Sequence, residues 1–499
     1  MWNYLIDSFF FVLSPIPLLY VALGVFLGIT VGAIPGLTGS MLIALTVPLT
    51  FYMDNDLALI LLVAMYVGAI SGGLITATLL RMPGTPASVV TTFDGYPLAK
   101  SGKSGRAIGI GIMSSFVGGL ISWIFLITLS PPLAKVALKF GPFEFFSLVL
   151  MALVMISAVG EGSILKGFIS GLLGLLAACP GMDALSGTLR LEFGFDEMAA
   201  GFSLIPVLIG LFGISQIITD LTNIERKVER IPISFKGMFL SLKDLKDQAT
   251  NLIRSSVLGT WVGILPGIGA NIGSLLAYSA AKSSSKKPQD FGKGSEEGIV
   301  ASEAANNATI GGALIPLVTL GIPGSLVDAI LLGALILHDL TPGPLLFRDD
   351  PQLVYNIMTT AFVGNVIMFF FMLFASVIIA RVIDIPKTFL IPTILAFCVV
   401  GTYALNNRTF DVWVMFGFGI LGFLMEKTKI PLGPFVIGLI LEPIAEKNIR
   451  SGLMLSDGSF LPVLTRPLSL AFVILALITL VWTLYRELKH QKALQKAGL

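Results

Sequence analysis

The stretch Val31-Gly32-Ala33-Ile34-Pro35-Gly36 returns later in the chain as Val262-Gly263-Ile264-Leu265-Pro266-Gly267. A second stretch, residues 70–85, contains GGL and then Pro-Gly-Thr, and it returns over residues 310–325 with Pro-Gly-Ser. In each copy, Pro-Gly interrupts helix-like apolar sequence at two places. A helix interrupted within lipid exposes unpaired backbone groups, which protein or a water-filled cavity must satisfy. Matching interruptions in two halves of a chain indicate the binding site of a secondary transporter.

The composition is typical of a helical membrane protein. Of 499 residues, 55% are hydrophobic and 12% are charged. Apolar runs long enough to span a bilayer recur at 57–80, 107–130, 198–219, 353–380 and 467–485. We expect an all-α polytopic membrane protein in a lipid bilayer, with about 11–12 transmembrane helices, inverted repeats and broken or re-entrant helical hairpins.

Several classes of function are excluded by what the chain lacks. Cys179 and Cys398 have no CxxC spacing, and His338, expected in a loop, is far in sequence from His490 in the polar tail. A disulfide framework, a metal cluster and histidine-based chemistry are therefore not expected. The net charge of +2 argues against nucleic-acid binding. Protease, lipase and ATPase motifs are missing, so we expect no enzyme and no cofactor.

Loop charges predict the topology, because cytoplasmic loops collect Lys and Arg. The basic tail after Tyr485 and the basic stretch 220–254 are both predicted to be cytoplasmic. The loop that follows the first Pro-Gly-Thr, around residues 100–106, is basic, whereas residues 339–350 after Pro-Gly-Ser are acidic. The two copies are therefore predicted to be inverted repeats, although Lys135 and Lys139 fall on the predicted outer side.

Four parts of the chain follow from this pattern. Residues 1–219 form the first repeat half, 220–254 a cytoplasmic linker, 255–466 the second repeat half, and 467–499 a C-terminal transmembrane helix with a cytoplasmic tail. Apolar residues recur at helical spacing over 238–252. This spacing fits an amphipathic helix on the membrane surface and a solvated linker helix equally well.

Residues 255–281 are predicted to enter and leave the membrane by the same face. The arms on either side of 266–269 would have about 11 residues each and reach about 16 Å, short of a hydrocarbon core of about 30 Å. This favours a re-entrant helical hairpin. Segment 18–51 would be its mirror image, with a discontinuous span as the alternative.

The breaks themselves supply the predicted site. Proline removes an amide and glycine permits positive φ, so freed carbonyls can hold a cation while the next half-helix presents its N-terminus to an anion. The predicted substrate-binding residues are Thr85, Ser88, Asn306, Asn307, Ser325, Gly84 and Gly324. The predicted cation-binding residues, for Na⁺ or H⁺ as coupling ion, are Pro35, Gly36, Thr38, Gly39, Pro266, Gly267, Gly269 and Asn271.

Four polar residues near these breaks have two interpretations each. Asn306 and Asn307 lie at the start of a long apolar segment and would either bind a ligand or form interhelical hydrogen bonds or caps. Glu303 would either act with them or simply interact favourably with a helix dipole. Arg81 would either contact the anion or extend to the membrane interface.

The chain resembles the TctA family, the large membrane subunit of the tripartite tricarboxylate transporters, from roughly residue 18 to 466. The motifs that carry the resemblance are GAIPGLTGS (32–40), residues 72–109, VGILPGIGANIGSLLAY (262–278), residues 291–325 and GALILHDLTPGP (333–344). The matching positions include Pro35, Gly36, Thr38, Gly39, Pro83, Gly84, Thr85, Pro86, Ala87, Ser88, Pro266, Gly267, Gly269, Asn306, Asn307, Pro323, Gly324 and Ser325. Three positions depart from the family pattern: Ser302 replaces a proline, Ala304 replaces a serine, and Asp328 stands where an uncharged residue is usual.

The resemblance implies a multi-pass symporter of the bacterial inner membrane. It also implies a small TctB-like membrane subunit, a periplasmic TctC-like solute-binding protein, and carboxylate substrates from tricarboxylates to aromatic acids. We therefore expect a cation-coupled secondary transporter that imports an organic carboxylate. A passive channel or a non-transporting scaffold subunit is the alternative, and a homodimer is left open.

Overall fold

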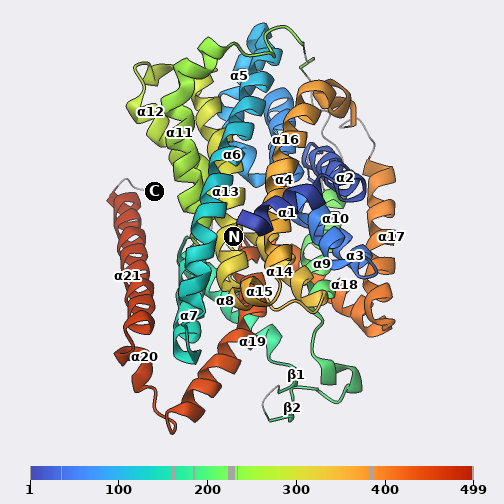
Figure 1. Ribbon diagram of the computed structural model, residues 1–499, viewed down its shortest axis with the longest axis vertical. Helices are drawn as coiled ribbons and strands as arrows, with labels where there is room; N and C mark the ends of the chain where they lie inside the picture. The colour runs from blue at the N-terminus through green and yellow to red at the C-terminus, as the bar shows by residue number, and fades with distance from the viewer. Residues whose placement is uncertain are drawn as a thin grey trace.

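A computed structural model describes residues 2–34, 36–159, 163–183, 186–222, 231–232, 234–382 and 387–496. Helices dominate this part of the chain, and its one sheet is a pair of two-residue antiparallel strands, β1 (Gly181–Met182) and β2 (Leu189–Arg190). The helices form a bundle, with β1 and β2 at its lower end (Figure 1). The expected all-α polytopic membrane protein is confirmed.

The helices of the first half are α1 (Trp2–Val12), α2 (Pro15–Gly32), α3 (Gly39–Thr50), α4 (Asn55–Leu80), η1 (Pro86–Phe93), α5 (Gly95–Leu98), η2 (Ala99–Lys103), α6 (Ser104–Ala137), α7 (Pro142–Val159), α8 (Ile164–Ala178), η3 (Asp196–Ala200), α9 (Leu204–Ile209), η4 (Gly210–Ile214) and α10 (Ser215–Thr222).

Those of the second half are α11 (Leu242–Ile264), α12 (Gly269–Ser284), η5 (Pro288–Asp290), α13 (Glu296–Leu320), α14 (Leu326–Leu337), α15 (Pro344–Asp349), α16 (Pro351–Val382), α17 (Lys387–Asn406), α18 (Thr409–Lys427), α19 (Leu432–Leu455), α20 (Leu461–Thr465) and α21 (Pro467–Lys496).

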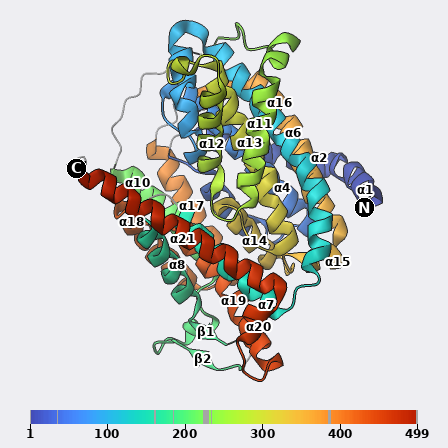
Figure 2. The ribbon, with the colours of Figure 1, turned by 90° about the vertical axis from the view of Figure 1, so that its left-hand side faces the viewer.

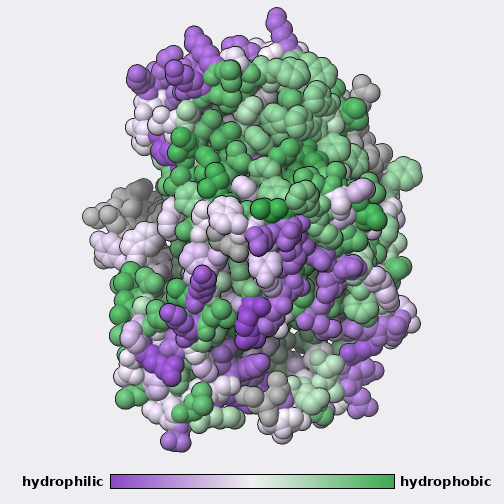
Figure 3. All heavy atoms as spheres, viewed as in Figure 1, coloured by the Kyte–Doolittle hydropathy of each residue, from purple (hydrophilic) through white to green (hydrophobic). Residues whose placement is uncertain are grey.

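Eight helical segments of the described chain are long and apolar enough to span a membrane. They are 15–32, 55–80, 95–137, 204–222, 351–379, 388–406, 409–427 and 467–485. Large apolar side chains are exposed on them, for example Phe374 of α16 and Ile478 of α21. Hydrophobic residues form a broad surface over the upper part of one face (Figure 3). Such a surface suits lipid rather than water. The predicted number of 11–12 spans stays a prediction.

The first hairpin is made by α2 and α3, which lie against α4. A Cβ on Gly28 would lie 2.4 Å from Met65 O, and one on Gly32 would lie 2.3 Å from Ala69 O, so α2 runs in the same direction as α4. The following helix, α3, returns toward the start of α4. Its last residue, Thr50, has Oγ1 3.2 Å from His338 Nε2, and His338 Nδ1 is 3.0 Å from Asn55 Oδ1 in the first turn of α4. Segment 18–51 is therefore a hairpin and not a discontinuous span.

The second hairpin, α11 and α12, lies against α13 in the same way. A Cβ on Gly259 would lie 2.3 Å from Ala305 O, and one on Gly263 would lie 2.5 Å from Thr309 O. The return helix, α12, brings Tyr278 to Asp94, a carboxylate that also binds the start of α13. Figure 2 shows α11, α12 and α13 side by side.

One expectation about this hairpin is wrong. Its first arm is the continuous 23-residue helix α11 and not a half-helix of about 11 residues as predicted, and residues 254 and 255 both lie within this helix. The predicted amphipathic helix over 238–252 is largely the first half of α11. A capping box at Ser241 and Asp244 starts this helix, and no Gly or Pro interrupts it before Gly259. Charged side chains near Arg254 do not break a helix, because they can extend into the solvent while the backbone bonds continue.

The two long helices α4 and α13 run in opposite directions. The carboxylate of Asp94, beyond the end of α4, accepts hydrogen bonds of 2.8 Å from the amides of Gly294 and Ser295 at the start of α13. At the other end, Asn55 at the start of α4 contacts His338, beyond α13 and α14. Near their middles the helices are joined by Ser71, which donates to Asn307 Oδ1 at 2.6 Å. This arrangement supports inverted repeats, while the division into four parts stays a prediction.

Candidate transport site

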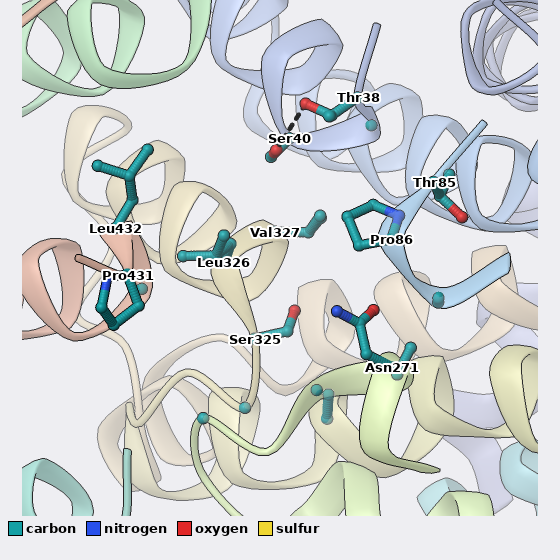
Figure 4. A pocket seen from close by; sticks show the side chains of 18 of the residues that line it. Thr38, Ser40, Thr85, Pro86, Asn271, Ser325, Leu326, Val327, Pro431 and Leu432 are labelled. Carbon is teal, nitrogen blue, oxygen red and sulfur yellow. Dashed lines mark hydrogen bonds between the residues drawn. The ribbon is translucent and has the colours of Figure 1, made fainter. Parts of the chain in front are cut away.

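A cavity of about 380 Å³ lies where the two hairpin tips and the two helix breaks meet. Its wall includes Thr38, Gly39 and Ser40 from the first tip, Thr85, Pro86 and Ala87 from the first break, Gly267, Gly269 and Asn271 from the second tip, and Gly324, Ser325 and Leu326 from the second break. The rest of the wall comes from α4, α7, α11 and α13, from η4 with α10, and from the α18–α19 turn around Pro431 (Figure 4). Residues distant in sequence thus form one chamber at mid-length of α4 and α13.

Four helices begin at this chamber. The first residues of α3, η1, α12 and α14 are Gly39, Pro86, Gly269 and Leu326, and all four line the wall. Each helix therefore directs its N-terminus, with its first backbone amides and a positive partial charge, at the same space. Such an arrangement can bind a negatively charged group without a basic side chain.

Hydroxyl groups cap three of these N-termini. Thr38 Oγ1 accepts from the Met41 amide at 3.2 Å, and Ser325 Oγ accepts from the Asp328 amide at 3.4 Å. In η1, Ser88 Oγ accepts from the Thr85 amide at 3.2 Å and donates to Thr85 O at 2.8 Å. The caps hold each break open in a defined geometry, since the residue before each helix is extended.

Polar side chains also reach into the chamber. Ser325 Oγ is 3.2 Å from Tyr66 Oη, and Thr38 Oγ1 is 2.9 Å from Ser40 Oγ. The amide of Asn271 and the hydroxyl of Ser325 point into the same space (Figure 4). These groups can donate hydrogen bonds to a ligand from both repeats.

The charges around the chamber are uneven. No Lys or Arg belongs to the part of its wall that the structure describes. One carboxylate does, Glu426, which lies in the last turn of α18, five residues before Pro431 in the sequence. In Figure 4 Pro431 and Leu432 lie across the chamber from Thr85 and Asn271. An anion is therefore expected on the side of Thr85 and Asn271, away from Glu426.

The chamber brings together eight of the predicted site residues. They are Thr85, Ser325, Gly324, Thr38, Gly39, Gly267, Gly269 and Asn271. Six others lie outside its wall: Ser88, Gly84, Asn306, Asn307, Gly36 and Pro266. The fifteenth, Pro35, lies outside the described residues.

Three of the residues outside the wall have contacts that explain their positions. Gly84 packs against Gly32, and Ser88 serves as a cap. Asn307 accepts from Ser71 of α4 and donates to Glu303 O at 3.2 Å. For Asn307 the geometry thus agrees with the interhelical interpretation. Asn306 is fully buried.

Three further polar residues that the sequence singled out, Arg81, His338 and Asp328, lie outside the chamber wall. Arg81 is exposed, ends α4 in a left-handed conformation, and lies over the Tyr96 ring at 5.9 Å, so it is not in the wall. His338, expected in a loop, ends α14 and is buried against Thr50 and Asn55. Asp328 is fully buried beside the Ser325 cap.

Sequence reasoning missed Tyr66, Glu426 and the α18–α19 turn. A signal for the turn was present, because Ile430-Pro431-Leu432-Gly433-Pro434 is another Pro/Gly interruption between apolar segments. Nothing comparable marks Tyr66, which lies in the middle of an uninterrupted apolar helix. Only the packing of α4 places it at the chamber.

The fold and the chamber define a multi-pass helical membrane protein of the transporter class. The family model described as "Tripartite tricarboxylate transporter TctA family" matches residues 18–437. The chain belongs to this family, and is thus a component of a tripartite tricarboxylate transporter.

Two relatives come from Agrobacterium vitis. The "Uncharacterized 52.8 kDa protein in TAR-I ttuC' 3'region" is 34% identical over 483 residues, which is 96% of this chain and 95% of the relative. The "Uncharacterized protein in TAR-II ttuC' 3'region" is 33% identical over 234 residues, which is 47% of this chain and 97% of the relative. No solved structure matches the chain.

Proposed function

We propose that the protein is a cation-coupled symporter that imports an organic carboxylate, and that the substrate carboxylates bind at the chamber. The convergence of four helix N-termini on one cavity carries this proposal. Amides and hydroxyls bind an anion reversibly, whereas a fully buried basic side chain would hold it more strongly. Reversible binding is what a transport cycle needs.

The substrate site takes in Thr85, Ser325 and Gly324 of the predicted set, together with Asn271, which was predicted to bind the cation. Its amide can donate two hydrogen bonds to a carboxylate. Asn306, Asn307, Ser88 and Gly84 would act from behind the wall by holding α13 and η1 in place.

The coupling cation, Na⁺ or H⁺, is proposed to bind at the hairpin tips. Backbone carbonyls at the ends of α2 and α11 carry negative partial charge, which favours a cation. At the first tip, a Cβ on Gly36 would lie 3.0 Å from Asp220 Oδ1, so a carboxylate is also close. Thr38, Gly39, Gly267 and Gly269 complete the two tips.

The rest of the system is proposed from family membership and loop charge. A periplasmic TctC-like protein would deliver the substrate, a TctB-like subunit would assemble with the chain in the bacterial inner membrane, and the C-terminus would be cytoplasmic. The two hairpins and breaks would move together against the remaining spans and alternate access to the chamber.

Uptake of radiolabelled citrate into membrane vesicles tests this function. We expect saturable uptake that depends on a cation gradient, and Ser325→Ala should weaken citrate affinity at least tenfold, or about 1.4 kcal/mol. The exposed Ser283→Ala on α12 is the matched control and should behave like the wild type. Flux that neither saturates nor needs a gradient would instead identify a passive channel, and absence of any flux in the complete complex would identify a scaffold.

A further inference from the structure

Glu303 is a carboxyl group that the chamber does not use. It lies two turns into α13, its side chain is fully buried, and it is not part of the chamber wall. The corresponding position of the first repeat is Val63, which is buried and apolar. Packing of the repeat therefore does not require a carboxyl group here.

The hydroxyl groups that contact the Glu303 carboxyl group come from two other elements, and the side chain of Asn306, one turn further along α13, also interacts with it. Its Oε1 is 2.5 Å from Thr91 Oγ1 of η1, and its Oε2 is 3.1 Å from Ser115 Oγ of α6. Thr91 Oγ1 is also 3.1 Å from Ser302 Oγ, which in turn donates to Ile299 O at 3.2 Å. These contacts form one continuous chain from the carboxyl group to a backbone carbonyl.

All four of these contacts can be hydrogen bonds at the same time only if the carboxyl group supplies a hydrogen. Thr91 has a single hydroxyl hydrogen, yet it faces both Glu303 and Ser302. If Glu303 is protonated, it donates to Thr91, Thr91 donates to Ser302, and Ser302 donates to Ile299. Ser115 still donates to the other carboxyl oxygen. Every contact then has its own hydrogen.

No positive side chain among the described residues pairs with Glu303. The ionisable groups on the helices packed against α13 have other partners: Arg106 of α6 binds Glu296 and Asp244, Arg254 of α11 binds Asn251, Tyr278 of α12 binds Asp94, and Tyr66 of α4 binds Ser325. In the part of the chain that the structure describes, none of the other ionisable groups on these helices is a hydrogen-bond partner of Glu303. They are Lys135, Lys243, Lys246, Asp247, Lys282, Asp56, Tyr96, Asp328, Arg348 and Asp349. An ionised carboxylate buried without a cation is strongly unfavourable, and such groups take up a proton instead.

We propose that Glu303 is a proton-binding site of this transporter, separate from the hairpin tips. The contact with Thr91 connects it to the chamber, because η1 carries Thr85 and Ala87 in the wall and Thr91 at the carboxyl group. Six residues of a 3₁₀ helix span about 12 Å. A shift of η1 on substrate binding would change the hydrogen-bond acceptor of the Glu303 proton. The coupling of this proton to transport rests on the proposed function, but the presence of a proton on Glu303 does not.

Infrared spectroscopy of the full chain tests the proton without any transport. At neutral pH the wild type should show a protonated carboxyl C=O band that is absent in Glu303→Gln and present in the matched control Glu297→Gln. Identical carboxyl bands in wild type and Glu303→Gln from acidic to alkaline pH would overturn the proposal. Loss of the band when sodium replaces potassium at constant pH would also overturn it, because the site would then bind sodium.

A second variant covers the case in which Glu303→Gln does not fold. Ser115→Ala removes a hydrogen bond that favours the ionised form more than the protonated one, so the band should persist to higher pH, with about tenfold higher proton affinity. No change in the titration of the band would contradict the proposal.

Citrate flux in vesicles tests the coupling. Glu303→Gln should keep citrate exchange across the membrane but lose accumulation driven by a proton gradient. Accumulation by this variant at the wild-type level would overturn the coupling role. If the wild type shows no saturable exchange, the proposed function fails, while the infrared result still decides whether Glu303 holds a proton.

Discussion

The two hairpins, α2–α3 and α11–α12, are attached to their long helices by the same glycine contacts. A Cβ on Gly72 would lie 2.4 Å from Ile29 O, and one on the corresponding Gly312 would lie 2.3 Å from Thr260 O. Likewise, Gly84 packs against Gly32 O and Gly324 against Gly263 O. Backbones approach this closely only where side chains are absent, as is common between membrane helices. The scaffold is therefore shared between the repeats.

The tips of the two hairpins differ in what surrounds them. The first tip, at Gly36, faces the carboxylate of Asp220. The second tip, at Gly267, faces Ile156, and its amide donates to Gly324 O at 2.9 Å. The two repeats therefore pack in the same way but have different groups at their tips. They can contribute different chemistry to one chamber.

The largest expected effect tests the shared scaffold. Gly84→Ala would place a methyl group 2.2 Å from Gly32 O and 2.5 Å from Thr76 Oγ1, and Gly324→Ala would place one 2.7 Å from Gly263 O. We expect both to destabilise the protein, Gly84→Ala by about 3 kcal/mol and Gly324→Ala by less, because overpacking forces the backbones apart. Thermal unfolding in detergent measures this.

The control for the glycine variants is Gly417→Ala in α18, where no atom lies within 4 Å of the added methyl group. It should be neutral or slightly stabilising, since alanine favours a helix by about 0.5–1 kcal/mol over glycine. Equal stability of Gly84→Ala and Gly417→Ala would contradict the close helix contact.

The next effect compares the polar groups of the two tips. Ser40 and Asn271 occupy corresponding positions and both line the chamber. Asn271→Ala should weaken citrate binding about tenfold and Ser40→Ala less, because an amide group has two donor hydrogens and a hydroxyl group has one. Binding to purified protein by calorimetry measures both. A larger loss for Ser40→Ala would place the carboxylate at the first tip instead.

The starts of the two long helices differ in charge. Glu296 of α13 pairs with Arg106, which also binds Asp244 at 2.7 Å. By contrast, Asp56 of α4 accepts a hydrogen bond from the uncharged side-chain amide of Asn356. Arg106→Gln should destabilise the protein by about 1–2 kcal/mol, since these groups are only partly exposed. Asn356→Ala should cost about 1 kcal/mol.

The same cluster predicts a pH dependence. Hydrogen bonds from Arg106 and Ser241 hold the pKa of Asp244 well below its usual range. A depressed pKa contributes stability that is complete above the ordinary value of about 3.9 and is lost as the pH falls below it. The difference in unfolding temperature between wild type and Arg106→Gln should therefore be constant from neutral to mildly acidic pH. If this difference in unfolding temperature already became smaller at pH values well above the ordinary pKa of an aspartate, the assigned pKa shift of Asp244 would be contradicted.

The smallest expected effect concerns how α4 and α13 end. Arg81 and Gly321 correspond, and both have left-handed conformations, with φ of 56° and 69°. Arg81→Gly should relieve about 1 kcal/mol of strain, partly offset by loss of the contact with Tyr96, whereas Gly321→Ala should introduce a similar strain. Citrate uptake by Arg81→Gly should stay at the wild-type level. Loss of uptake would restore the interpretation of Arg81 as an anion contact.

The hairpins could be predicted because the local sequence alone marks their tips. Pro-Gly at 266–267 interrupts the helix because proline removes an amide and glycine permits positive φ, so this interruption needs no knowledge of the rest of the fold. The length of α11 could not be predicted in this way. Its first turns are charged, and it is their packing against α13 and the bond from Asn251 to Glu297 O that keep them in one helix.

The candidate site also contains residues that the local sequence predicts and residues whose positions depend on packing. Thr85, Ser325 and Asn271 follow the breaks directly, so the half-helices that start there carry them to the chamber. Asn307 and Glu303 lie within a continuous helix, where the rotation of that helix decides which way a side chain points.

By itself, the sequence determined that the chain is a helical membrane protein with paired interruptions at matching positions, because hydropathy and Pro-Gly chemistry act locally. Only the tertiary structure decided which polar residues meet. Tyr66 and Asn306 occupy corresponding positions in the two repeats, yet Tyr66 lines the chamber and Asn306 is buried away from it. The physical reason is that α4 and α13 cross with different neighbours, and such contacts depend on residues far away in the chain.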